Sequence, residues 1–115
     1  MNAVERLNEL QAQAGVFGQA SPVVAPKFYE LCQIGYENNA PLDYKTQQLF
    51  LLGLCTANGC EEGMLIHGSM FLGAGGTREE LIAVLNLVVL AAGGPGIAHA
   101  GEALDIFDQL AKANK

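Results

Sequence analysis

The chain has 115 residues, half of them hydrophobic, which is enough for a single domain with a core and excludes a disordered chain. Twelve acidic residues outnumber six basic ones, and no lysine or arginine cluster forms, so a nucleic-acid partner is not expected. The N-terminus, "MNAVERLNEL", lacks the features of a secretory signal, and the apolar stretch 81–92 is too short to cross a bilayer. We expect one cytoplasmic domain, residues 1–115, with no membrane span.

Signals for helices recur along the chain, whereas signals for strands do not. Ser21 before Pro22 is a typical helix start, Asp43 is a typical N-cap, and Thr77 with Glu80 forms a capping box. "NNAP", Asn-Gly, "GAGG" and "GGPG" are typical of the segments between helices. These signals predict an all-α fold of about six helices: an N-terminal segment, then residues 21–37, 43–57, 60–72, 77–92 and a last helix that begins near residue 95.

Two stretches of the expected helices, residues 49–57 and 81–92, are apolar on nearly every side. Such a helix has to be surrounded, and a domain of this size has few elements to surround it. Burial between copies of the chain resolves this conflict. The pattern therefore predicts a homo-oligomer, with a compact monomer as the alternative.

The segment "TANGCEEGMLIHG", residues 56–68, holds the residues best suited to chemistry. We expect Cys60 in the first turn of a helix, where backbone N–H groups and the helix dipole stabilise a thiolate. His67 lies two turns later on the same face and is a candidate proton acceptor for this thiol. Glu61 and Glu62 oppose ionisation of the thiol, and a purely structural role for the Cys60 and His67 pair remains open.

A longer stretch, "LDYKTQQLFLLGLCTANGCEEGMLIHGSMFLGAGGTREELIAVLNLVVLAAGGPGIAHA", resembles the carboxymuconolactone decarboxylase-like family, which includes the alkylhydroperoxidase D proteins. The "NGC…H" core, the glycine turn, "TREE" and "GGP" carry the resemblance in that order. It covers about residues 42–100 and implies the family's helical fold in an oligomer, trimeric or hexameric. Redox members have a Glu followed, one helix later, by C-x-x-C-x-x-x-H. On this chain the first Cys falls on Cys60, the His on His67, the second Cys on Gly63 and the Glu on Gln48.

The two replaced positions, Gln48 and Gly63, change the expected chemistry. A glycine within a helix costs about 1 kcal/mol relative to alanine. The resemblance implies that Gly63 marks a lost cysteine, and hence a lost or altered function, rather than a packing demand. Without that cysteine the oxidised Cys60 has no local resolving thiol, so a small external thiol or dithiol would have to reduce it. Gln48 can orient a partner but cannot carry a proton as a carboxylic acid does.

Two further residues are candidates for the same site. Cys55 and Cys60 would point in different directions on one continuous helix, although the Asn-Gly break allows a redirection; a small core residue is the simpler interpretation of Cys55. His99 either lines the same cleft as His67 or is an ordinary histidine on a helix face. The cysteines and histidines lack zinc-motif spacing, and the glycine turns lack the preceding strand of a nucleotide loop. We therefore expect no metal and no cofactor.

Three functions follow from this sequence. The leading one is a peroxidase or thiol oxidoreductase with an incomplete C-x-x-C site, an antioxidant activity in which Cys60 attacks a hydroperoxide and His67 serves as its base. The second is lactone decarboxylation or a related proton transfer by His67, with His99 as a second candidate proton carrier. For this reaction Arg78 is the one nearby arginine able to hold a carboxylate. The third is a non-catalytic oligomeric scaffold or binding protein.

Overall fold

The structure is a computed structural model that describes residues 1–114. Over these residues it contains six α-helices and no strand: α1 (Ala3–Ala20), α2 (Val24–Glu37), α3 (Tyr44–Ala57), α4 (Glu61–Gly73), α5 (Arg78–Ala92) and α6 (Gly94–Ala113). The predicted all-α fold of about six helices is confirmed. None of these helices is both long enough and apolar enough to cross a membrane.

Three of the six helices, α1, α3 and α5, begin at a residue whose side chain caps the helix. The side chain of Asp43 accepts a hydrogen bond from the Thr46 N–H over 2.8 Å, and Thr77 and Glu80 form the expected capping box. Helix α2 has no such cap, and the expectation that it starts at Ser21 is wrong. Instead the Ser21 N–H donates to the carbonyl of Phe17 and closes α1. Helix α2 starts only at Val24 because the preceding helix uses Ser21 as its own end.

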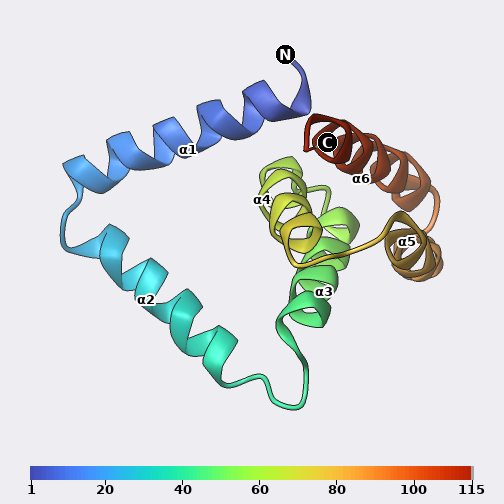
Figure 1. The fold of residues 1–115 in the computed structure, drawn as a ribbon, viewed down its shortest axis with the longest axis horizontal. Coiled ribbons are helices and arrows are strands. Elements are labelled where there is room, and N and C mark those ends of the chain that lie inside the picture. The colour runs from blue at the N-terminus through green and yellow to red at the C-terminus, as the bar shows by residue number, and fades with distance from the viewer. Residues whose placement is uncertain (115) are drawn as a thin grey trace.

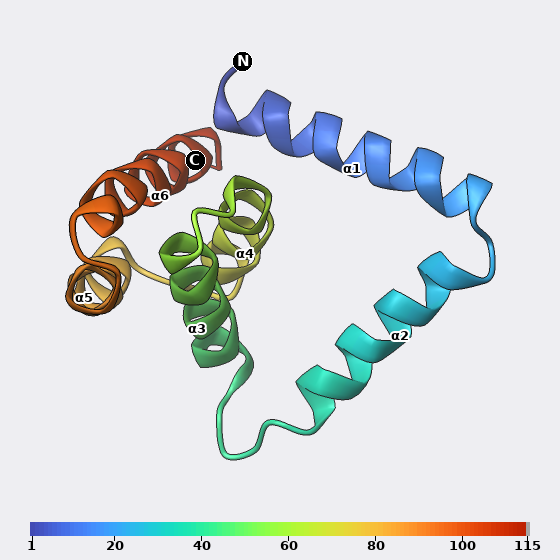
Figure 2. The same ribbon diagram turned by 180° about the vertical axis from the view of Figure 1, so that it is seen from behind.

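Helices α3 to α6 pack together, and the first half of α1 lies against α4 and α6 (Figures 1 and 2). Their buried side chains form one core, in which each large apolar side chain contributes about 1.5–3 kcal/mol on burial. The largest side chains with almost no exposed surface are Leu52, Met64, Leu65, Phe71 and Leu81. Three of them, Met64, Leu65 and Phe71, come from α4, which lies in the middle of this group (Figure 1).

Helix α2 is the least packed element, and both views show it extending away from α3 to α6 (Figures 1 and 2). Most of its large apolar side chains are exposed, among them Phe28 at 60% and Leu31 at 63%. The outer faces of α3 and α5 are also apolar and form an open groove of about 360 Å³. Large apolar surfaces of this kind are uncommon on monomers, so they agree with the predicted self-association, which stays a prediction.

Candidate functional site

The connection between α3 and α4 is a tight turn built around Gly59, whose φ is +67°. The Cys60 N–H donates to the Cys55 carbonyl over 2.8 Å, and the Gly59 N–H donates to the Thr56 carbonyl over 3.1 Å. These two hydrogen bonds and the left-handed glycine define a Schellman motif. In this motif the side chains of the two outer residues commonly contact each other. Here both outer residues, Cys55 and Cys60, are cysteines.

The two thiols differ in exposure. Cys60 is exposed and is the N-cap of α4, one residue before the first helical turn in which we expected it. Cys55 is half-buried. Burial raises the pKa of the Cys55 thiol, and the neighbouring Cys60 raises it further through its charge and a hydrogen bond. Cys55 therefore stays protonated at neutral pH.

Gly63 lies one turn into α4, buried beside both sulfurs. A Cβ atom on Gly63 would overlap the Sγ of Cys55 and would stand 3.3 Å from the Sγ of Cys60. Packing against Cys55 therefore accounts for the glycine at position 63. The expectation that this glycine does not reflect a packing demand is wrong. The sulfur of Cys55 fills the space that a side chain at position 63 would otherwise take.

Gln48 and His67 form a second pair between α3 and α4. The Nδ1 of His67 lies 2.8 Å from the Oε1 of Gln48, which is fully buried. Burial lowers the pKa of His67, so its ring is neutral at neutral pH. Since the amide oxygen is an acceptor, Nδ1 carries the hydrogen and Nε2 is left as the basic nitrogen. The other end of the amide, Nε2 of Gln48, has no hydrogen-bond partner among residues 1–114.

Cys60 and His67 are not joined by a hydrogen bond within residues 1–114. The thiol of Cys60 donates instead to Oε2 of Glu62 over 3.9 Å. Sequence reasoning treated Glu62 only as an opposing charge and missed this role. The signal was its position in the first turn of the helix, two residues after the N-cap, where its side chain can reach back to the cap.

His99 approaches the same turn from α6. A Cβ on Gly59 would stand 2.9 Å from the Nε2 of His99, so the imidazole lies against the turn that carries Cys60. The structure thus places His99 near the predicted nucleophile. Within residues 1–114 no group of three or more His, Cys, Asp or Glu side chains is arranged to hold a metal ion.

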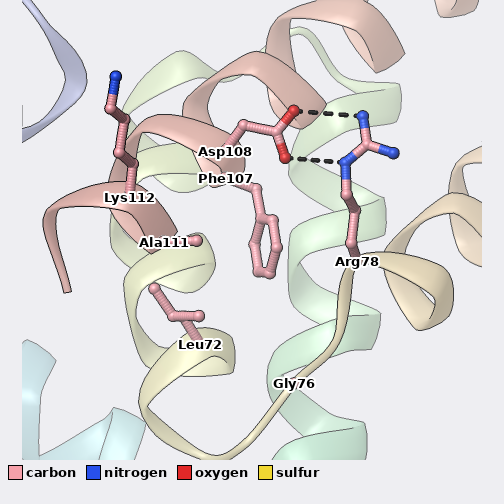
Figure 3. Close-up of a pocket in the computed structure, with 7 residues that line it drawn as sticks. All are labelled: Leu72, Gly76, Arg78, Phe107, Asp108, Ala111 and Lys112. Carbon is pink, nitrogen blue, oxygen red and sulfur yellow. Dashed lines mark hydrogen bonds and ion pairs between the residues drawn. The ribbon is translucent and has the colours of Figure 1, made fainter. Parts of the chain in front are cut away.

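A separate open pocket of about 590 Å³ lies where α6 meets the segment between α4 and α5 (Figure 3). Neither a cysteine nor a histidine is among its lining residues. Arg78 and Asp108 face each other in it, joined by hydrogen bonds of 2.9 and 3.2 Å (Figure 3). Arg78, the expected anchor for a substrate carboxylate, is therefore already bound to a carboxylate of its own chain.

Comparisons with known proteins agree with this fold. An uncharacterized protein of Cupriavidus necator is 33% identical over 105 residues, which cover 91% of this chain and 92% of that protein. The crystal structure of an apo carboxymuconolactone decarboxylase family protein from Legionella pneumophila matches with a TM-score of 0.89 at 28% identity, over 95% of this chain and 96% of its own. Residues 22–105 match the sequence model of the carboxymuconolactone decarboxylase family. The resemblance inferred from the sequence is confirmed, and the chain belongs to the carboxymuconolactone decarboxylase family.

Proposed function

We propose that this protein is a thiol-dependent peroxidase whose attacking group is Cys60. One observation carries the proposal: the Cys60 thiol is exposed at the start of α4 and donates to the carboxylate of Glu62, which can receive its proton. Within residues 1–114 no side chain caps the first turn of α4, so the backbone N–H groups beside Cys60 stay free to donate to a peroxide oxygen.

The reaction is an attack of the Cys60 thiolate on an oxygen of a hydroperoxide. A sulfur–oxygen bond forms as the oxygen–oxygen bond breaks, and Cys60 becomes a sulfenic acid. The leaving alkoxide takes up the proton that the thiol had given to Glu62, and departs as an alcohol. A thiol reductant then returns the sulfur to its starting state.

The proposal is tested by single-turnover consumption of cumene hydroperoxide by the reduced protein, with sulfenic acid trapped by dimedone and located by mass spectrometry. Wild type and Cys32→Ser should react at equal rates, whereas Cys60→Ser should not react. Glu62→Gln should slow the reaction by roughly 10²-fold because the proton acceptor is lost. Glu61→Gln is the matched control, since Glu61 pairs with Arg6. Undiminished consumption by Cys60→Ser would contradict the assignment.

Proton transfer by His67 is a second candidate, favoured by the Gln48 hydrogen bond that leaves Nε2 of His67 basic. This reaction requires His67 and no cysteine, so Cys60→Ser would keep it. The engagement of Arg78 with Asp108 weighs against lactone decarboxylation, because this reaction needs an anchor for a substrate carboxylate. The peroxidase is therefore the better supported function.

A further inference from the structure

We infer that Cys55 is the resolving thiol of this site, so that oxidation joins Cys55 and Cys60 in a disulfide across the turn between α3 and α4. The inference rests on the proposed attack by Cys60. It replaces the external resolving thiol, expected from the glycine at position 63, with one supplied by the preceding helix.

The backbone of the turn brings the two cysteines together. The hydrogen bond from the Cys60 N–H to the Cys55 carbonyl, 2.8 Å long, fixes the separation of these residues. In a Schellman motif they are the pair whose side chains meet. A disulfide requires Cα atoms that are close, and a turn closed by this hydrogen bond keeps the two cysteines close.

The surroundings of Gly63 on α4 also show that the sulfurs of Cys55 and Cys60 lie close together. A single added Cβ on Gly63 would overlap the Sγ of Cys55 and stand 3.3 Å from the Sγ of Cys60. Both sulfurs therefore border one small space, and only a glycine leaves this space free for them. The second sulfur has not been lost from the site but enters it from α3.

The chemistry balances with a hydroperoxide as oxidant and an external dithiol as reductant. After Cys60 has become a sulfenic acid, the sulfur of Cys55 attacks the sulfur of Cys60. A sulfur–sulfur bond forms, the sulfur–oxygen bond breaks, and the hydroxide leaves as water with the proton of the Cys55 thiol. The dithiol then attacks the exposed sulfur of Cys60, releases Cys55 as a thiol, and leaves as its own disulfide.

Exposure assigns the two roles. Cys60 is open to solvent, as a thiol that meets both peroxide and reductant has to be. Cys55 is half-buried behind it, and burial keeps its thiol protonated, so it does not compete for the peroxide. Cys55 needs only to reach a sulfur that is already beside it.

The sequence offers a direct test because Asn58-Gly59, between the two cysteines, is the only Asn-Gly pair in the chain. Hydroxylamine cleaves this bond. Reduced protein is treated with hydroperoxide or with diamide, free thiols are alkylated in denaturant, and the chain is then cleaved. Wild type and Cys32→Ser should give halves that stay joined until a reductant is added. Cys55→Ser and Cys60→Ser should give separate halves, because Cys60 is the one cysteine of the C-terminal half.

The two oxidants separate this inference from the proposed function. Joining by diamide but not by hydroperoxide would uphold the cysteine pair and contradict the peroxidase. Separate halves in wild type after both treatments would overturn the pair. So would dithiol-dependent peroxide turnover by Cys55→Ser at the wild-type rate, although the peroxidase would then stand.

Gly63→Ala tests the pair without removing a sulfur. Its methyl group would occupy the space that both sulfurs border, so the joined product should be lost or should form more slowly than in wild type. Gly68→Ala on the same helix is the matched control, since its Cβ would make an ordinary 3.7 Å contact with Leu110. Equal yields of joined product from the two alanine variants would contradict the inference. Circular dichroism establishes that each variant is folded.

Discussion

The amide of Gln48 determines which nitrogen of His67 carries a hydrogen. A glutamate here would hold the imidazole as a cation through its charge, whereas the neutral amide only orients the ring. Glutamine in place of glutamate at position 48 therefore removes a proton carrier but keeps the imidazole of His67 neutral, so that it can act as a base. The pair could be predicted from the sequence only through the family resemblance, because Gln48 and His67 are far apart along the chain and nothing in either helix alone indicates their contact.

Burial of His67 makes stability depend on pH. Its pKa in the folded protein is lowered from the ordinary 6.5, so the unfolded chain binds the proton more readily. The stability that comes from neutral His67 is complete above pH 6.5 and is lost as the pH falls through the lower folded value. We expect the urea midpoint of wild type to decline more steeply below pH 6.5 than that of His67→Gln. A wild-type slope that His67→Gln leaves unchanged would show that another group is responsible; His99→Gln serves as the control.

At the scale of helices, most boundaries could be predicted because capping is local. Asp43, Thr77 and the glycine turns act through neighbours within four residues, and their effects are visible in the sequence. The contact of Cys55 with Cys60 was underestimated for a related reason. On one continuous helix, side chains five residues apart point in different directions. Asn58-Gly59 ends the helix, however, and the Schellman motif formed there brings Cys55 and Cys60 together. Gly59 is the sequence signal for this motif, and its position in the motif identifies Cys55 and Cys60 as the two outer residues.

Two glycines of α4, Gly63 and Gly68, differ in whether a methyl group would fit beside them, and this difference can be tested. Gly68→Ala should raise the free energy of unfolding by about 0.5–1 kcal/mol, because alanine restricts the unfolded chain and the added methyl group fits. Gly63→Ala should show no such gain, since its methyl group overlaps Cys55. Urea denaturation of both variants under reducing conditions measures the difference. Equal stabilisation of the two would mean that the space beside the sulfurs is larger than the structure indicates.

At the scale of the whole molecule, the apolar surface is larger than one copy of the chain can cover. Leu87 and Leu90 on α5 are 63% and 81% exposed, and most of the large apolar side chains of α2 are exposed as well. Composition alone indicated this excess. The separation of α2 from the core could not be predicted, because an amphipathic helix has the same pattern whether its partner is its own chain or another copy.

We expect sedimentation equilibrium at low micromolar concentration to show an oligomer and no folded monomer. Leu90→Lys should weaken the association, because a charge would replace an apolar side chain that is exposed in the isolated chain. Gln13→Lys makes the same change of charge on an exposed part of α1 and should have no effect. A wild type that sediments as a folded monomer would contradict the argument.

The space bordered by Gly63 and the Cys55 sulfur holds one side chain and not two. Cysteine at position 55 and cysteine at position 63 are therefore mutually exclusive solutions for this backbone. A single Gly63→Cys replacement would collide with Cys55, and only the exchange of both residues, Cys55→Ala with Gly63→Cys, would move the second sulfur from one helix to the other. Gly63→Cys alone would put two side chains into one space, and Cys55→Ala alone would leave the site with the sulfur of Cys60 only. Evolution from one to the other without this collision would then have to pass through a site with a single cysteine sulfur, or change both residues together.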